Sequence, residues 1–248
     1  MEKYEHTQDF FVKYCDVDFK DELKLSTVLA LLEEVACSSA DELGFGYKFV
    51  KPRGYAFVVS NIYCEFYKPV QIGETVRLKT WPTPPTRVVF GREYQILSSL
   101  GELCAEATSR WCLLDINTGK ILKSDVVENQ DYSTYNTTKL FDELRWKIPA
   151  CSQEDGEHKF SITIANSEYD HNMHVNNTRY ADYCLNCFSI TELSVMQLKT
   201  FMISYVRQVH EGETLRFYRR KLEDGTYVVS GFNDENILVM QAQLHFEE

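Results

Sequence analysis

The sequence predicts an α+β protein with two similar halves, each a long helix wrapped by a curved antiparallel sheet. Two observations carry this prediction: a stretch of sequence that occurs twice, and one helical pattern followed by several β-rich runs in each half. At 248 residues with 44% hydrophobic residues, the chain is long enough for one large domain or for two domains of about 120 residues each.

The repeat is clearest around a Gly-Glu-Thr sequence. Residues 66–78, FYKPVQIGETVRL, resemble residues 205–217, YVRQVHEGETLRF. In both copies apolar and polar residues alternate on either side of the Gly-Glu pair, which is typical of strands around a turn. We therefore expect two antiparallel strands joined by a hairpin in each half.

One helix is expected before each copy of the repeat. In the first half apolar residues recur at helical spacing, and Gly44 and Gly46 supply a stop. In the second half Asn176 or Asn177 is available as the N-cap. The apolar helical positions are Leu25, Val28, Leu29, Leu32, Val35 and Ala36 in the first half, and Tyr180, Tyr183, Cys184, Cys187 and Phe188 in the second.

Several β-rich runs follow each helix. A helix and a sheet with one apolar face must bury these faces against each other. A helix wrapped by a sheet is the hotdog fold, and two hotdogs in tandem account for the chain length. The expected strands are 55–67, 88–97 and 104–114 after the first helix, and 202–209, 215–221, 227–232 and 237–246 after the second.

The expected domains are an N-terminal hotdog at 1–125, a linker at 126–158 and a C-terminal hotdog at 159–248. The linker region is polar, but apolar positions within 140–149 favour a segment that docks on a surface. A disordered tether is the alternative.

The net charge of -11 disfavours nucleic acid as a partner, because phosphate binding needs a basic surface. The first residues, MEKYEHTQDFF, have no apolar run or basic cluster, and no window reaches the length of a membrane span. These features favour a cytoplasmic protein without a membrane partner.

Eight cysteines occur without framework spacing and are expected to be reduced thiols. Cys184 and Cys187 form a single CxxC pair, for which two buried thiols on a helix are a better interpretation than a zinc site. We therefore predict no metal and no cofactor.

Residues 170–184, DHNMHVNNTRYADYC, resemble the active-site loop of acyl-ACP thioesterases, whose pattern is D-x-N-x-H-V-N-N-x-x-Y. Residues 57–69, residues 105–115 and the second Gly-Glu turn also resemble this family, so the resemblance covers most of the chain. It implies the tandem hotdog fold and a hydrolase of fatty acid biosynthesis that acts on fatty acyl-ACP, similar to the bacterial branch. The filled pattern positions are Asp170, Asn172, His174, Val175, Asn176, Asn177 and Tyr180.

The chemistry of thioester hydrolysis suits these residue types. The thiol leaving group has a pKa of about 8.5 and departs without much help from an acid. His174 is the expected base that takes a proton from water. Asp170 can orient the imidazole or close the turn before the helix. Asn172, with backbone N–H groups at the helix start, can stabilise an oxyanion.

The sequence departs from the plant members of this family at one site position. Their additional catalytic Glu falls on Gln208, and a cysteine of those enzymes falls on Val209. Valine cannot attack a thioester, and glutamine can position water but cannot act as a base. Proton transfer is therefore left to His174 with Asp170.

The first half lacks this chemistry, because its corresponding loop, residues 15–26, contains no histidine. The resemblance implies that this half forms the apolar pocket for the acyl chain. Plain core packing predicts the same residue types. The candidate pocket residues are Val28, Leu32, Val59 and Ile62.

The implied partner, acyl carrier protein (ACP), is acidic, so a local basic patch is needed for docking. If the patch is absent, acyl-CoA becomes the more attractive substrate. A hotdog dehydratase and a non-catalytic acyl-binding module are further alternatives. A tandem chain can be monomeric or can form a homodimer. Candidate docking residues are Lys199, Arg207, Arg216, Arg219, Arg220 and Lys221, although strand alternation can split them between two faces.

Overall fold

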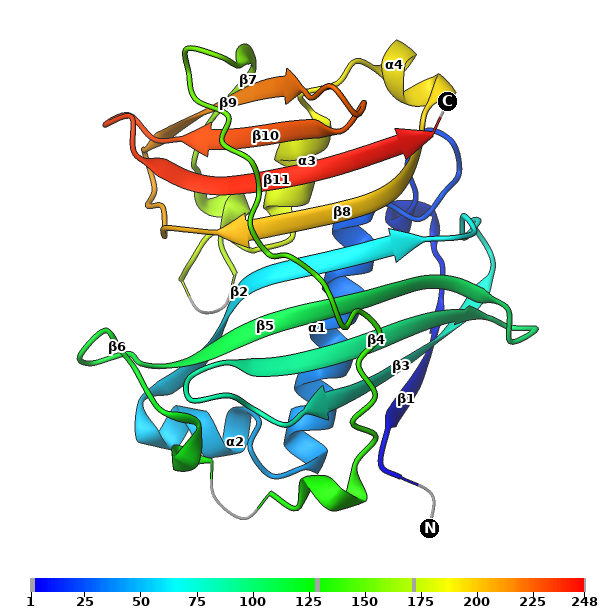
Figure 1. Ribbon diagram of the computed structural model, residues 1–248, viewed down its shortest axis with the longest axis vertical. Coiled ribbons are helices and arrows are strands. Elements are labelled where there is room, and N and C mark those ends of the chain that lie inside the picture. The colour runs from blue at the N-terminus through cyan, green and yellow to red at the C-terminus, as the bar shows by residue number, and fades with distance from the viewer. Residues whose placement is uncertain (1–2, 128–129, 171–172, 248) are drawn as a thin grey trace. The chain divides into compact units, whose positions relative to one another are not determined.

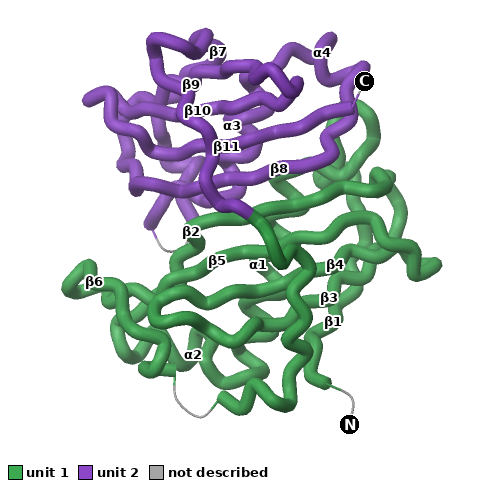
Figure 2. Tube along the Cα trace, viewed as in Figure 1, with its two compact units in different colours: residues 1–144 green, residues 145–248 purple. Residues whose placement is uncertain are grey.

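The computed structural model describes residues 3–127, 130–170 and 173–247. The chain divides into two compact units, Met1–Leu144 and Arg145–Glu248 (Figure 2). Each unit consists of one antiparallel sheet and its helices (Figure 1). The predicted α+β tandem hotdog fold is confirmed.

Unit 1 contains a sheet with strand order β1-β3-β4-β5-β2, and the short β6 pairs with β5. Three-residue 3-10 helices lie at Tyr14–Asp16, Lys51–Arg53, Ser124–Val126 and Tyr132–Thr134. The main elements are β1 (His6–Phe11), α1 (Leu25–Glu42), α2 (Tyr47–Val50), β2 (Tyr55–Phe66), β3 (Thr75–Thr83), β4 (Phe90–Ser98), β5 (Leu103–Asp115) and β6 (Lys120–Ile121).

Helix α1 forms for the reason the sequence predicts. Its apolar positions, spaced by three or four residues, make one buried face that packs on the sheet of unit 1. The helix ends at Glu42, and Gly44 follows with a φ of 81°, a left-handed conformation that glycine adopts at low cost. The predicted stop is therefore confirmed.

Unit 2 repeats this plan with strand order β7-β9-β10-β11-β8. β7 takes the place of β1, and β8 takes the place of β2. A 3-10 helix lies at Asn166–Glu168. The main elements are β7 (Glu157–Thr163), α3 (Arg179–Leu185), α4 (Ile190–Val195), β8 (Gln197–Tyr205), β9 (Thr214–Lys221), β10 (Tyr227–Phe232) and β11 (Leu238–Glu247).

The helix of unit 2 is shorter than the sequence pattern indicates. Helix α3 ends at Leu185, so Cys187 and Phe188 lie beyond it, although both are buried. The cause is a capping box at the start of α4. The side chain of Ser189 accepts a hydrogen bond from the backbone N–H of Glu192, whose carboxylate accepts from the N–H of Ser189.

The predicted hairpins at the two Gly-Glu turns are wrong. β4 and β5 lie between β3 and β2 in the sheet of unit 1, so the strands before and after the first turn are not neighbours. Instead, the turn pairs with the chain that follows β1: Gly73 N–H donates to the Val12 carbonyl, and Val12 N–H donates to the Glu74 carbonyl. Alternation identifies a strand, but it does not identify the strand's partner.

The second turn makes the same hydrogen bonds with the chain after β7. Gly212 N–H donates to the Ile164 carbonyl, and Ile164 N–H donates to the carbonyl of Glu213, each at 2.9 Å. The glutamate side chains are also equivalent, since Glu74 accepts from Gln71 N–H and Glu213 accepts from His210 N–H. The sequence repeat therefore records a shared structural turn.

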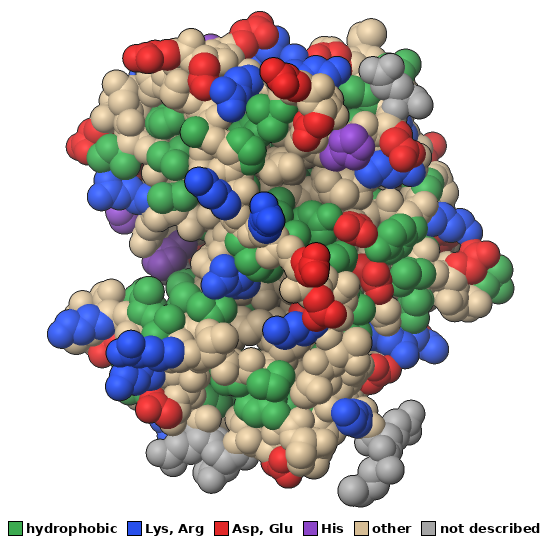
Figure 3. Space-filling view, viewed as in Figure 1, with side chains coloured by type: hydrophobic (Ala, Val, Ile, Leu, Met, Phe, Trp, Pro, Cys, Tyr) green, Lys and Arg blue, Asp and Glu red, His purple; other side chains and the backbone are tan. Residues whose placement is uncertain are grey.

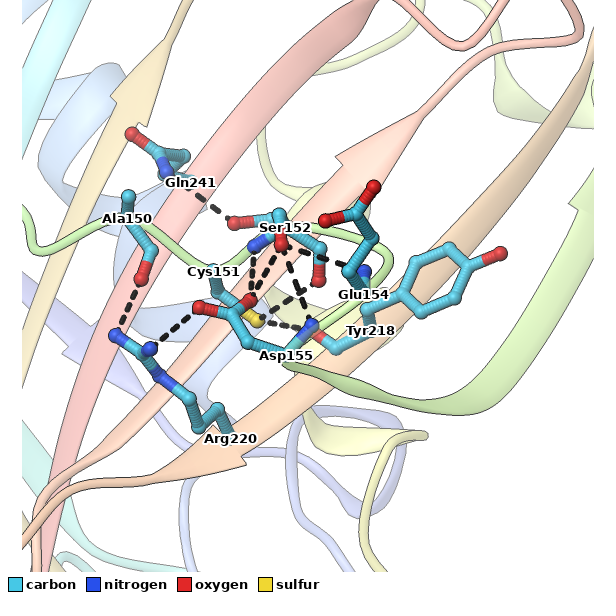
Figure 4. A network of polar contacts seen from close by, with 9 residues as sticks. Ala150, Cys151, Ser152, Glu154, Asp155, Tyr218, Arg220 and Gln241 are labelled. Carbon is cyan, nitrogen blue, oxygen red and sulfur yellow. Dashed lines mark hydrogen bonds and ion pairs between the residues drawn. The ribbon is translucent and has the colours of Figure 1, made fainter.

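The boundary between the two units falls within the segment predicted as a linker. On unit 1, the Trp81 indole N–H donates to the Thr138 carbonyl at 2.8 Å, and the ring of Phe141 lies edge-on to that of Tyr63. On unit 2, residues 150–155 contact β9 through Arg220 (Figure 4). The described part of this segment is thus packed on the units and is not a free tether. The predicted domain limits stay a prediction.

None of the helices in the described ranges is both long and apolar enough to cross a lipid bilayer.

Candidate active site

The motif resembling the thioesterase loop lies in unit 2, after the 3-10 helix Asn166–Glu168, and continues into α3. Tyr169 and Val175 form an antiparallel bridge at the base of a tight loop. Asn172 and His171 lie outside the described residues. The structure therefore places Asp170 and His174 on the two sides of one loop.

Asp170 and His174 are joined by two hydrogen bonds. Asp170 N–H donates to the carbonyl of His174 at 2.8 Å, and His174 N–H donates to Asp170 Oδ1 at 3.2 Å. Met173 has a φ of 62°, which is uncommon for a residue with a side chain. Its N–H donates to the Asp170 carbonyl at 3.2 Å. Together these contacts fix the backbone that presents His174.

Asp170 therefore performs the turn-closing role that the sequence offered as the alternative to catalysis. One carboxylate oxygen accepts from a backbone amide, while a carboxylate has capacity for several further hydrogen bonds. The turn role and an orienting role for the imidazole can coexist. The orienting role stays a prediction.

The side chain of His174 is half-buried. Within the part of the chain that the structure describes, no residue forms a hydrogen bond with its imidazole. The next residue, Val175, is buried and anchors the loop in unit 2. His174 is thus held at its backbone.

The N-cap of α3 is Thr178, so the predicted N-cap at Asn176 or Asn177 is wrong, and the side chain of Asn176 instead closes the turn before the helix. Its Oδ1 accepts from the N–H of Thr178 at 2.9 Å, and its carbonyl accepts from the N–H of Arg179 at 3.0 Å. These two N–H groups are therefore engaged, and an oxyanion role for other donors at the helix start and for Asn172 stays a prediction. Tyr180 is buried in the core, as predicted.

Gln208 lies after the end of β8, on a segment attached to the motif loop at two points. Before it, the Tyr205 hydroxyl donates to the Asn177 carbonyl at 3.0 Å. After it, the Glu211 N–H donates to the Tyr169 hydroxyl oxygen at 2.6 Å. Gln208 itself is exposed, while Val209 is fully buried. The chain around Gln208 is therefore held next to the loop that carries His174.

The sequence reasoning missed Tyr169, Tyr205 and the half-buried carboxylate of Glu168. The Tyr183 hydroxyl donates to Glu168 Oε2 at 2.5 Å, and the guanidinium of Arg179 lies 3.7 Å from the same carboxylate. The Glu168 carbonyl also accepts from the N–H of Asn176 at 2.8 Å. No pattern in the sequence signals these contacts, because they depend on how the loop folds back on α3.

The candidate pocket residues lie in unit 1, on α1 and β2. All four are at most 8% exposed. This burial agrees with a pocket lining and with ordinary core packing alike, so their role in acyl-chain binding stays a prediction. The four are Val28, Leu32, Val59 and Ile62.

The described residues contain no group of three or more His, Cys, Asp or Glu side chains that could hold a metal ion. Cys184 and Cys187 are buried thiols. Burial raises the pKa of Cys187 to about 12 and that of Cys184 well above its usual value, so both thiols are protonated near neutral pH. Cys184 and Cys187 are therefore core residues of unit 2.

The fold and the loop define a tandem hotdog protein with its histidine motif in the second unit. Residues 3–129 match the acyl-ACP thioesterase N-terminal domain, and residues 152–242 match the acyl-ACP thioesterase C-terminal domain. The chain belongs to the acyl-ACP thioesterase family.

Similar curated proteins come from plants. Oleoyl-acyl carrier protein thioesterase 1, chloroplastic, of Arabidopsis thaliana is 22% identical over 224 residues, which cover 85% of this chain and 62% of that protein. Palmitoyl-acyl carrier protein thioesterase, chloroplastic, of Gossypium hirsutum is 22% identical over 220 residues, which cover 85% of this chain and 53% of that protein. The chain thus spans less than two thirds of the length of these relatives.

Solved structures show the same fold over the whole chain. An acyl-ACP thioesterase from Bacteroides thetaiotaomicron has a TM-score of 0.87 and 21% identity, covering 98% of both chains. The 12:0-ACP thioesterase from Umbellularia californica has a TM-score of 0.85 and 17% identity, covering 98% of this chain and 97% of that one.

Proposed function

We propose that this chain is a fatty acyl-ACP thioesterase that releases a free fatty acid and ACP from fatty acyl-ACP. The observation that carries this proposal is the complete histidine motif on a loop whose backbone is fixed by Asp170. Membership of the family and the names of the plant relatives support it.

In the proposed mechanism, His174 takes a proton from a water molecule that attacks the thioester carbonyl carbon. The carbonyl oxygen gains negative charge, which the Asn172 side-chain N–H would stabilise. Collapse of the intermediate breaks the C–S bond, the carrier leaves as a thiolate, and the thiolate takes up the proton held by His174. Gln208, held beside the loop, would position the water through its amide.

The test is the release of free thiol from acyl-ACPs of short, medium and long chain length. We expect turnover by the native protein and its loss in His174→Ala. His158→Ala is the matched control, because His158 lies on β7 of the same unit and contacts Ser161. Unchanged turnover in His174→Ala contradicts the mechanism.

The same assay separates the alternatives. Tight binding of acyl-ACP without thiol release supports a non-catalytic acyl-binding module. This alternative is considered because position 208 carries a glutamine in place of an acid. Faster turnover of acyl-CoA than of acyl-ACP identifies an acyl-CoA thioesterase. Homodimer formation and a cytoplasmic location stay predictions of the sequence.

A further inference from the structure

The basic residues around β9 are poor candidates for the carrier docking site, because the structure pairs most of them with carboxylates. Arg219 lies 2.9 Å from Glu192 on α4, and its guanidinium stacks over Phe188. Arg220 pairs with Asp155 and also donates to the Ala150 carbonyl (Figure 4). An acidic partner would have to displace these carboxylates. Two further pairs are Arg216–Asp234 and Lys199–Glu247.

A different group of basic side chains lies at one end of unit 1, around α2 and β6. We call it the α2–β6 surface, and Figure 3 shows Lys and Arg side chains at this end of the unit with some Asp and Glu beside them. All of its members are exposed. They are Lys48, Lys51, Arg53, Arg87, Lys120 and Lys123.

Backbone contacts bring these sequence-distant segments together. Ile116 N–H, in the turn before β6, donates to the Gly54 carbonyl after α2 at 2.9 Å. Ser124 N–H donates to the Arg87 carbonyl at 3.0 Å. Beneath the segments lies one hydrophobic cluster that includes Val50 and Phe90. The α2–β6 surface is therefore a single structured region of unit 1.

The cations of the α2–β6 surface have no carboxylate partner among the residues that the structure describes. Within the described ranges, none of the six forms an ion pair. Arg53 lies 4.1 Å over the ring of Phe49 and donates to its carbonyl, and Lys51 donates to the hydroxyl of Tyr47. Cation–π contacts hold a side chain in place while its positive charge remains.

The local charge balance is opposite to that of the whole protein. Residues 41–54, 84–90 and 115–127 contain six basic and four acidic residues, whereas the chain has 26 basic and 37 acidic residues. Two of the four carboxylates are already engaged. Glu42 contacts His6, and Asp115 accepts from the backbone N–H groups of the turn at 117–118.

We propose that the α2–β6 surface is the docking site for the acidic carrier protein, which rests on the proposed function. With a net charge of -11, the protein repels an acidic partner over most of its surface, so encounter requires a local positive field. Unpaired, exposed cations provide that field without the cost of breaking ion pairs.

The experiment measures binding, so that it does not depend on turnover. The probe is ACP that carries a lauroyl group through an amide in place of the thioester, and its Kd is measured by fluorescence anisotropy at low and high salt. The test variant is Lys48→Ala with Lys120→Ala, and the control is Arg216→Ala with Lys221→Ala. Each removes two positive charges from an exposed or half-buried position.

We expect the test variant to raise Kd about tenfold at low salt and the control about twofold or less. The difference should shrink at high salt, because exposed charges are screened. Equal weakening in both variants, weakening in the control alone, or no binding by the native protein overturns the proposal.

Failure of the proposed function can be distinguished from failure of the docking proposal. If the native protein binds the amide-linked probe at the α2–β6 surface but releases no thiol from acyl-ACP, docking stands and hydrolysis is rejected. With acyl-pantetheine, which has no carrier, the two variants should turn over like the native protein. A loss there would point to an effect on the fold or the site and would contradict a docking role.

Discussion

The hydroxyl oxygen of Tyr169 accepts a 2.6 Å hydrogen bond from the backbone N–H of Glu211. Tyr169 precedes Asp170 in the motif loop, and Glu211 lies in the turn before β9, three residues after Gln208. This contact connects the loop that presents His174 with the segment that carries Gln208. The relative position of two proposed site residues therefore depends in part on this phenol group, together with the Tyr205 hydroxyl bonded to the Asn177 carbonyl.

Tyr169→Phe should lower kcat about tenfold while changing the free energy of unfolding by about 1 kcal/mol, the usual net value of one hydrogen bond. The reason is that the ring still packs but the segment with Gln208 keeps only its attachment through Tyr205. Steady-state kinetics with acyl-ACP and urea unfolding measure the two effects.

Tyr218→Phe is the matched control for this variant. Tyr218 lies on β9 of the same unit, and in the described ranges its hydroxyl forms no hydrogen bond, although its ring contacts His158 and Phe232. We expect kinetics like those of the native protein. Equal losses in the two variants would show that Tyr169 acts only through general stability.

Gln208 offers a direct test of water positioning. Gln208→Ala should lower kcat, because the amide that would orient water is removed, and its exposure means that stability should not change. Gln208→Glu should retain activity near neutral pH and lose it at acid pH, where a carboxyl of pKa about 4.3 becomes protonated. The pH profile of kcat/KM measures this. If Gln208→Ala matches the native enzyme at every pH, the residue has no part in the reaction.

The sequence predicted the repeat, the helix α1 and most strands, because these depend on local patterns. The run 227–232 was predicted with the bounds that β10 has. Strand partners were not predictable in this way. Alternation around Gly73 fits a hairpin and a strand crossing equally well, and only the fold selects the pairing with β1.

The break between α3 and α4 was readable in principle. Ser189 and Glu192 have the spacing of a capping box, but the buried Cys187 and Phe188 continue the apolar pattern across the break. In the site, the motif identified Asp170 and His174. Contacts such as Tyr169 with Glu211 join residues far apart in sequence, so no local pattern predicts them.

Gly231 on β10 lies so close to two buried side chains that a Cβ at this position would be in steric conflict with them. A Cβ there would lie 2.8 Å from Cε1 of Phe217 and 3.3 Å from Cγ of Met240, and both side chains are fully buried. Gly231→Ala should therefore destabilise unit 2 by about 1–3 kcal/mol. Urea unfolding measures it. Gly231→Ala with Phe217→Leu should recover part of the loss, and no recovery would contradict the steric cause.

Glu93 on β4 should make the stability of unit 1 depend on pH. The side chain is 5% exposed; Oε1 accepts from the Thr108 hydroxyl at 3.1 Å and Oε2 from Leu140 N–H at 3.4 Å. Burial raises the pKa of this carboxyl to about 7, and the nearby charge of Asp142 also raises it. The two hydrogen bonds and the charge of Lys139 lower it.

A raised carboxyl pKa means that the folded protein holds a proton that the unfolded chain releases. The contribution of Glu93 is therefore fully present below the unfolded pKa of about 4.5 and is lost as pH rises through about 7. The loss is on the order of 3 kcal/mol at most, from about 1.4 kcal/mol per unit of pKa. Glu93→Gln, which cannot ionise, should flatten the fall of unfolding free energy between pH 5 and 8, measured by urea titration at each pH.

Glu102→Gln is the control, because Glu102 is exposed and paired with Lys68, and its variant should keep the slope of the native protein. If Glu93→Gln also keeps that slope, Glu93 is ionised in the folded protein across this range, and its contacts with Thr108 and Leu140 stabilise the charged form.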